Sequence, residues 1–215
     1  MKKMFLVLML LLTVVLTACN VVEDDIIDTP SDKVEISHVV NLGNQDGKVV
    51  YETRVEEVKV NPKKVAIWSF AVLDMLDFVG FDKTGIEVLG LPLAQTPSYL
   101  EDYNNPTTFN IGTVAGAAVP IYETLDLMNP DLIIIDGRSA SLYLAFKERY
   151  PEADVIDLSN TNYSHMQQRD VVTTLGKIFP NVKVELQAEM DSISTEILKI
   201  RQFATTTETV FLMLN

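Results

Sequence analysis

Residues 129–138 read Asn-Pro-Asp-Leu-Ile-Ile-Ile-Asp-Gly-Arg, and Leu132–Ile135 is the most apolar short run of the chain. Four large aliphatic residues without a polar interruption are typical of a strand that is covered on both faces, as strands inside a parallel sheet are. The preceding Asn-Pro pair is typical of the end of a helix, here predicted over residues 121–128. The run therefore predicts a central parallel strand followed by a polar loop at Gly137 and Arg138.

Further strands and helices alternate on both sides of this run. Short apolar runs predict strands, and spaced apolar residues between Gly and Pro punctuation predict helices. Such alternation is typical of an α/β layered domain with a parallel sheet. The predicted strands are 65–68, 85–89, 132–135 and 154–158, and the predicted helices are 71–79, 121–128, 139–150 and 164–179.

The segment before this domain has the pattern of an antiparallel ribbon. Val34–Val40 and Lys48–Thr53 are rich in β-forming residues, and Asp46-Gly47 between them is a strong hairpin signal. A third run, Val55–Val60, is predicted as a separate strand that leads into Asn61-Pro62.

The C-terminal segment has a different pattern. Leu186, Met190, Ile193, Ile197 and Ile200 follow one another at steps of four and three residues, which predicts one apolar stripe on a long helix over 181–205. Residues 209–214 then form an apolar run that predicts a buried strand, although nothing follows it in the chain to cover it.

The N-terminus has the pattern of an export signal. Two lysines precede an apolar run over residues 4–18, which is too short for a membrane-spanning helix and suits a secretory signal peptide. Leu16-Thr17-Ala18-Cys19 resembles the lipobox of bacterial lipoproteins, in which the Cys is acylated and becomes the mature N-terminus. The alternative is a plain secretory signal with an incidental Cys.

Composition excludes several classes of function. A net charge of −13 argues against nucleic-acid binding, which needs a basic face. One Cys excludes an internal disulfide and a Cys-rich metal centre, and two His make a His-built metal site improbable. Catalytic sequence motifs are lacking, so we expect no enzyme activity, no cofactor and no resident metal.

Several motifs together resemble the ferric-siderophore-binding lipoproteins of ABC importers, and within them the catecholate (petrobactin-type) branch. The resemblance covers residues 58–215. The motifs are Asn61-Pro62-Lys63-Lys64-Val65, Leu73-Asp74-Met75-Leu76, Gly90-Leu91-Pro92, Asn110-Ile111-Gly112-Thr113 and the run at 129–138.

This resemblance implies two α/β lobes joined by one long helix, with the ligand held between the lobes. The chain stops where the second lobe would begin, so we expect a fragment or truncated form that contains the N-terminal lobe. The expected parts are a signal peptide (1–18), an acidic tether (19–33), a β ribbon (34–60), the N-terminal lobe (61–180), the interlobe helix (181–205) and the first strand of the absent lobe (206–215).

Arg138 and Gly137 are the first candidates for ligand binding. Ligands of parallel sheets bind beside the carboxyl ends of the strands. A planar guanidinium suits the anionic oxygens of a ferric tris-catecholate, and Gly137 leaves room beside it. On its spacing alone Arg138 fits an exposed residue paired with Asp136 or Glu148. The resemblance implies that it points into the cleft.

Other strand-end loops supply further candidates. Trp68, Ser69 and Phe70 follow the strand at 65–68 and are expected to form a cleft wall, unless Trp68 belongs to the core. Leu91 and Thr113 lie in other loops expected to line the cleft. The resemblance also implies that Glu123 docks to an Arg of the permease, whereas an exposed helical Glu is commonly only solvated.

We therefore expect a monomeric, non-enzymatic binding lipoprotein that captures a ferric siderophore and delivers it to an ABC permease. It would be exported and lipid-anchored at the outer face of the cell membrane, or lie in the periplasm. One alternative keeps the fold but binds cobalamin or haem. Others are a single-lobe structural surface lipoprotein and a non-functional remnant.

Overall fold

The computed structural model describes residues 32–159 and 164–206. The predicted signal peptide, Cys19 and the final apolar run at 209–214 lie outside the described residues. The strands are β1 (Lys33–Gln45), β2 (Lys48–Lys59), β3 (Lys64–Ile67), β4 (Val88–Leu91), β5 (Phe109–Asn110), β6 (Gly112–Thr113), β7 (Val119–Pro120), β8 (Leu132–Ile135) and β9 (Asp154–Asp157). The α-helices are α2 (Phe70–Phe78), α3 (Tyr122–Met128), α4 (Tyr143–Arg149), α5 (His165–Ile178) and α6 (Lys183–Thr206), and 3₁₀ helices cover Phe81–Thr84, Leu93–Gln95, Ser98–Tyr103, Ala140–Leu142 and Pro180–Val182.

A five-stranded parallel sheet forms the centre of the domain, in the order β5-β4-β3-β8-β9. Strand β8 is paired in parallel with β3 and with β9, and all four of its residues are buried. The prediction of a central parallel strand at 132–135 is confirmed. The α/β fold class with a central parallel sheet is confirmed with it.

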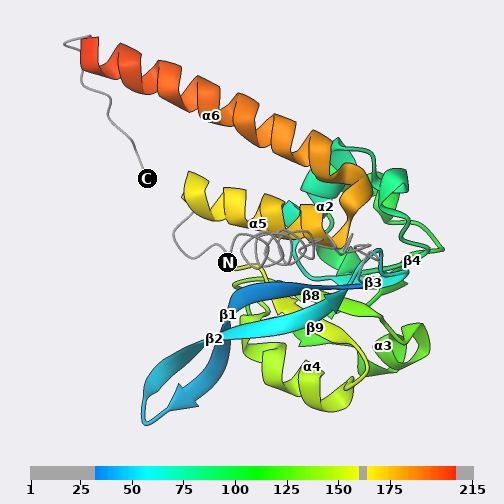
Figure 1. The fold of residues 1–215 in the computed structure, drawn as a ribbon. Coiled ribbons are helices and arrows are strands. Elements are labelled where there is room, and N and C mark those ends of the chain that lie inside the picture. Colours follow the sequence, from blue (N-terminus) through cyan, green and yellow to red (C-terminus); the bar gives the residue numbers. More distant parts are fainter. Residues whose placement is uncertain (1–31, 160–163, 207–215) are drawn as a thin grey trace, which may run out of the picture. The chain divides into compact units, whose positions relative to one another are not determined.

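Alternate residues of each strand point to opposite faces of the sheet, and each face has its own core. Val65 and Ile67 of β3 pack with α2 and α5 on one face. Ala66 of β3 and Ile133 of β8 pack with α3 and α4 on the other. Figure 1 shows the same three layers, with α2 and α5 on one side of the sheet and α3 and α4 on the other.

The predicted strand at 85–89 is misplaced and is corrected to β4 at Val88–Leu91. The chain first forms a 3₁₀ helix at Phe81–Thr84, and Gly85 ends it in the left-handed conformation, with φ of 73°. The backbone N–H groups of Glu87 and Val88 then both donate to the carbonyl of Lys63. Pairing with β3 therefore starts later than the apolar pattern suggests.

The ribbon contains two strands, so the separate third strand predicted at 55–60 is wrong. Strand β2 runs without a break from Lys48 to Lys59, because β1 is long enough to pair with it from Lys33 opposite Lys59 to Gln45 opposite Lys48, with one irregularity between Asn41 and Asn44. The turn is at Asp46-Gly47 as predicted, and both residues have positive φ. The β1–β2 pairing is continuous at Arg54, which lies opposite His38, and this explains why β2 does not end there.

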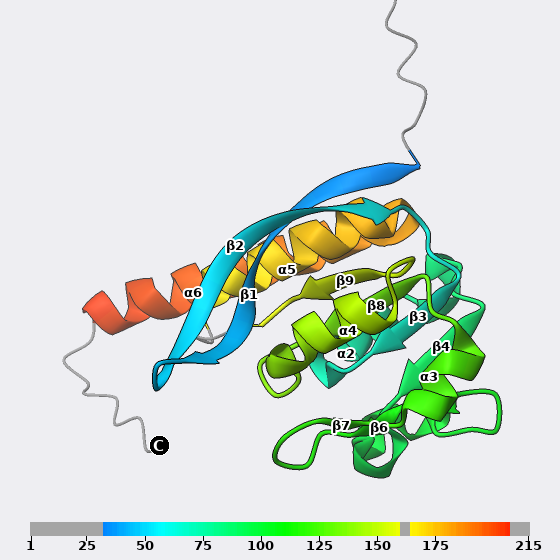
Figure 2. The same ribbon diagram turned by 90° about the horizontal axis from the view of Figure 1, so that it is seen from below.

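The ribbon lies beside β9 at the edge of the sheet (Figure 2). The backbone N–H of Lys59 donates to Asp154 at 2.7 Å, and the N–H of Asp157 donates to Nδ1 of the buried His38 at 2.9 Å. On α4, Tyr143 Oη donates to Glu56 of β2 at 2.5 Å. The ribbon thus covers an edge strand that would otherwise expose unpaired backbone groups.

Helix α6 matches the expected long helix, and its two halves differ in burial. Leu186 and Met190 are buried against the lobe, whereas Leu198 and Ile200 are more than half exposed. Figures 1 and 2 both show that α6 extends beyond the N-terminal end of α5. The apolar stripe predicted from the sequence is therefore covered only over its first half.

Candidate functional site

Loops at the carboxyl ends of β3, β8 and β9 surround a cleft of about 570 Å³. Because the strands of the sheet are parallel, these loops lie along one edge of the sheet, which is where ligands of such sheets bind. Helices α2 and α5 complete the wall. The residues that line the cleft include Trp68, Ser69, Phe70, Asp136, Gly137, Arg138, Leu158 and Ser159.

A tight turn after β8 presents Arg138 at the cleft. Asp136 and Ser139 hold the turn: the Asp136 N–H donates to Ser139 Oγ at 3.0 Å, and the Ser139 N–H donates to the Asp136 carbonyl at 2.8 Å. The Asp136 carboxylate also accepts from the Arg138 N–H at 3.2 Å. Ser139 is fully buried and anchors the turn to the protein interior, while Arg138 stays exposed.

The Arg138 guanidinium forms no ion pair with any carboxylate of the described residues. The alternative read from its spacing, a pair with Asp136 or Glu148, is therefore not found there, and Asp136 binds the backbone of Arg138 instead. A Cβ added at Gly137 would meet no atom within 4 Å, so this position borders open space. The cationic side chain is thus available at an open part of the cleft.

The loop after β3 supplies the inner wall of the cleft. Ser69 is the N-cap of α2, and its Oγ accepts from the Val72 N–H at 3.4 Å. Trp68 is 1% exposed and packs in the core shared with α4, with its ring 5.9 Å from that of Phe146. Trp68 is therefore a core residue at the base of the cleft, whereas Phe70 is half-buried.

The structure does not place Leu91 or Thr113 on the cleft lining. Leu91 is the last residue of β4 and is fully buried in the core. Thr113 lies in the short strand β6, and the next residue, Val114, lines the cleft. The Val114 N–H donates to Gln95 Oε1 at 3.1 Å, which fixes this part of the wall.

Cleft residues that the sequence analysis missed come mainly from helices. Met75 of α2 and Gln168 and Val171 of α5 line the cleft. A helix that follows a strand starts at the same edge of a parallel sheet, and this signal points to α5. The face that α5 turns to the cleft is set by its packing, which the sequence does not show.

Two carboxyl groups modify the charge near the cleft. Burial raises the pKa of Asp157, and the neighbouring Asp136 carboxylate acts in the same direction, while hydrogen bonds from Ser159 oppose the rise. Asp157 is 4% exposed and lines a separate cavity beside the ribbon, whereas Asp136 lines the cleft itself. The cleft therefore offers one guanidinium beside one carboxylate, so an anionic ligand would approach from the Arg138 side.

Metal binding finds no support in the residues the structure describes. They contain no group of three or more His, Cys, Asp and Glu side chains that could hold an ion. His38 lies in the ribbon, where burial lowers its pKa to about 4. Its Nδ1 accepts from the Asp157 backbone N–H, so it acts as a neutral structural residue.

Glu123 is exposed in the first turn of α3. Its side chain forms no hydrogen bond or ion pair with another described residue. Docking to a permease remains a prediction for this residue.

Over residues 32–159 and 164–206, no helix combines the length and the apolar character needed to cross a membrane.

The sequence of the chain is similar to that of a known binding protein. No protein-family model matches the chain. Over 207 residues the chain is 27% identical to the petrobactin-binding protein YclQ of Bacillus subtilis strain 168, a match that covers 95% of this chain and 59% of YclQ. The expected resemblance to siderophore-binding proteins is confirmed.

Solved structures support the same relationship. A TroA-like periplasmic binding protein from Xylanimonas cellulosilytica is 26% identical, with a TM-score of 0.66 over 81% of this chain and 54% of that one. The crystal structure of YclQ is 26% identical, with a TM-score of 0.60 over the same shares of the two chains. These relatives are binding proteins rather than enzymes. The present chain spans little more than half of their length and corresponds to one lobe.

Proposed function

We propose that this chain forms one ligand-binding lobe of an exported siderophore-binding lipoprotein, and that its cleft contacts a ferric catecholate. The observation that carries the proposal is the guanidinium of Arg138, which has no ion-pair partner among the described residues and stands at a strand-end cleft. The similarity to a petrobactin-binding protein supports the choice of ligand class. Delivery to an ABC permease and acylation of Cys19 belong to the same proposal.

The chemistry of the cleft suits such a ligand. A ferric tris-catecholate carries net negative charge and presents flat aromatic rings. Arg138 can donate charge-assisted hydrogen bonds to catecholate oxygens, and the Phe70 ring and the Val171 side chain can contact the catechol faces. Capture of an intact complex makes and breaks no covalent bond, in keeping with the lack of catalytic motifs.

Fluorescence titration tests the proposal directly, because Trp68 is the only Trp of the chain and lies at the base of the cleft. A ferric catecholate bound nearby should quench it by energy transfer even though the ring is buried. We expect saturable quenching of the full chain by ferric tris-catechol, with a dissociation constant on the order of 10–100 µM, because one wall alone encloses little ligand surface.

The control is N-acetyltryptophanamide at the same absorbance, which reports only the light absorbed by the ligand. Quenching of the protein that is linear and equal to this control would refute binding at the cleft. Haem and cobalamin are titrated in parallel. Tighter binding of either would favour the alternative ligands of the same fold.

A further inference from the structure

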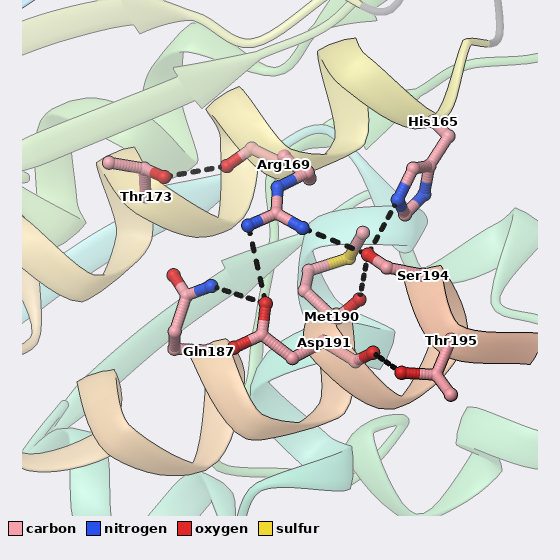
Figure 3. A network of polar contacts seen from close by, with 8 residues as sticks. All are labelled: His165, Arg169, Thr173, Gln187, Met190, Asp191, Ser194 and Thr195. Atoms are coloured by element: carbon pink, nitrogen blue, oxygen red, sulfur yellow. Dashed lines mark hydrogen bonds and ion pairs between the residues drawn. The ribbon is translucent and has the colours of Figure 1, made fainter. Parts of the chain in front are cut away.

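A network of polar side chains fastens α6 to α5 (Figure 3). We call it the α5–α6 clasp, and it consists of His165 and Arg169 of α5 with Asp191 and Ser194 of α6. The Arg169 guanidinium donates through Nη1 to Ser194 Oγ at 2.8 Å and through Nη2 to Asp191 Oδ1 at 3.2 Å. One planar side chain thus bridges two α6 residues that lie one helical turn apart.

Ser194 is the centre of the clasp, because its hydroxyl group uses all of its hydrogen-bonding capacity. It donates to the Met190 carbonyl at 2.6 Å, and its oxygen lies 2.8 Å from both Arg169 Nη1 and His165 Nε2. A hydroxyl has one proton and two acceptor positions. Since Arg169 can only donate, His165 must also donate, and its proton lies on Nε2.

The second contact of the clasp is reinforced from within α6. Gln187 Nε2 donates to Asp191 Oδ1 at 3.0 Å, the same oxygen that accepts from Arg169. His165 and Arg169 lie one turn apart on α5, and Asp191 and Ser194 lie one turn apart on α6. Contacts spread over a turn of each helix resist both rotation and sliding, which a single hydrogen bond would not.

The clasp lies where the burial of α6 changes. Met190 is buried, Ile193 is 37% exposed, and Ile200, two turns later, is 63% exposed. Apolar packing therefore holds the first half of α6 but weakens where the clasp begins. The polar contacts at Asp191 and Ser194 are placed to hold the helix at this transition.

We propose that the α5–α6 clasp sets the direction in which the exposed half of α6 leaves the lobe. Gln168 and Val171, which line the cleft, lie on the same helix as the clasp residues His165 and Arg169. Helix α5 therefore both forms part of the cleft wall and holds α6 in its direction. That this direction would place a second lobe over the cleft rests on the proposed function; the direction itself does not.

Distance measurements between spin labels test the proposal. Labels are attached to cysteines at Glu152 and Arg201, both exposed, in the full chain carrying Cys19→Ser in detergent. We expect one narrow distance distribution by double electron–electron resonance. Ser194→Ala and Arg169→Leu should each widen it at least twofold, because α6 then samples several directions.

Thr195→Ala is the matched control. Thr195 Oγ1 donates to the Asp191 carbonyl at 2.9 Å, the same kind of bond four residues back that Ser194 makes to Met190. Thr195 is exposed, however, and forms no hydrogen bond with a described residue of α5. The width should stay at the parent value. A parent-like width in both Ser194→Ala and Arg169→Leu would overturn the proposal.

If Arg169→Leu does not fold, Arg169→Lys takes its place in the experiment. Arg169→Lys retains the positive charge but cannot reach Asp191 and Ser194 together, so it should also widen the distribution. A parent-like width in folded Arg169→Lys and Ser194→Ala contradicts the proposal. The measurement uses no ligand, so its failure would leave siderophore binding standing, and a failed titration would leave the clasp standing.

Discussion

At the scale of single residues, Arg138 should dominate the affinity for an anionic ligand. Removing a charge-assisted hydrogen bond costs about 1.5–3 kcal/mol, so Arg138→Ala should weaken binding of ferric tris-catechol by roughly 10- to 150-fold. The Trp68 titration measures this change. Arg201→Ala removes the same charge from exposed α6 and should leave the affinity unchanged. Equal affinities for Arg138→Ala and the parent would remove Arg138 from the site.

His38 should make the stability of the lobe depend on pH. Burial lowers its pKa from 6.5 to about 4. Between these two pH values His38 is protonated in the unfolded chain but neutral in the folded chain. Stability contributed by neutral His38 is complete above pH 6.5 and is lost as the pH falls toward 4. We expect a decline of about 2–3 kcal/mol in the free energy of unfolding over this window.

Urea unfolding at several pH values measures this decline. His38→Gln keeps an acceptor for the Asp157 N–H but cannot take up the proton, so its stability should change much less between pH 6.5 and 4. An equally steep decline in His38→Gln would assign the effect to other groups. Glu56, whose pKa is held below its usual value, keeps its contribution above its ordinary pKa of 4.5 and loses it only as the pH falls below that value.

At the scale of elements, hydrogen bonds to a partly buried carboxylate fasten the ribbon to α4. Burial would raise the pKa of Glu56, but hydrogen bonds from Tyr143 and Lys147 outweigh it and hold the pKa below the usual range. Burial also raises the pKa of Tyr143 to about 12, so its hydroxyl remains a donor at neutral pH. Glu56 is therefore ionised and accepts from both residues.

Tyr143→Phe should destabilise the lobe by about 1–3 kcal/mol, because it removes a hydrogen bond to a charged acceptor without opening a cavity. Tyr150→Phe is the matched control: the Tyr150 hydroxyl donates to Asp126 at 2.9 Å, and this carboxylate is exposed and also bound by Arg149. Tyr150→Phe should lower the free energy of unfolding by less than Tyr143→Phe does. Urea unfolding compares the two, and a smaller loss for Tyr143→Phe than for Tyr150→Phe would contradict this account.

The elements also show what the sequence could predict. Strand β8 was predictable because its four consecutive apolar residues form a short run flanked by Pro130 and Gly137, and α6 because its stripe keeps the helical period over many residues. Strands β5, β6 and β7 have two residues each and no period to detect. The site divides in the same way: Arg138 follows from its strand, whereas Gln168 depends on how α5 packs.

At the scale of the whole molecule, the proposed function makes the cleft one wall of a binding site. Its cationic group, Arg138, stands at an exposed edge, while its apolar base at Trp68 is closed by the core. The match covers only 59% of the length of YclQ and 54% of each of the two solved structures. Weak binding by the lobe alone is therefore the physical expectation, because affinity rises with the ligand surface removed from water.

Anchoring at a membrane would raise the local concentration of such a lobe at the site where its ligand is taken up. Two or more acyl chains give stable attachment, since each buried CH₂ contributes about 0.8 kcal/mol. We expect that Cys19→Ser, expressed in a bacterial host, releases the protein from the membrane pellet into the soluble fraction. Asn20→Ser, which introduces the same side chain one residue later, should stay in the pellet. Retention of Cys19→Ser in the pellet after a high-salt wash would exclude acylation as the anchor.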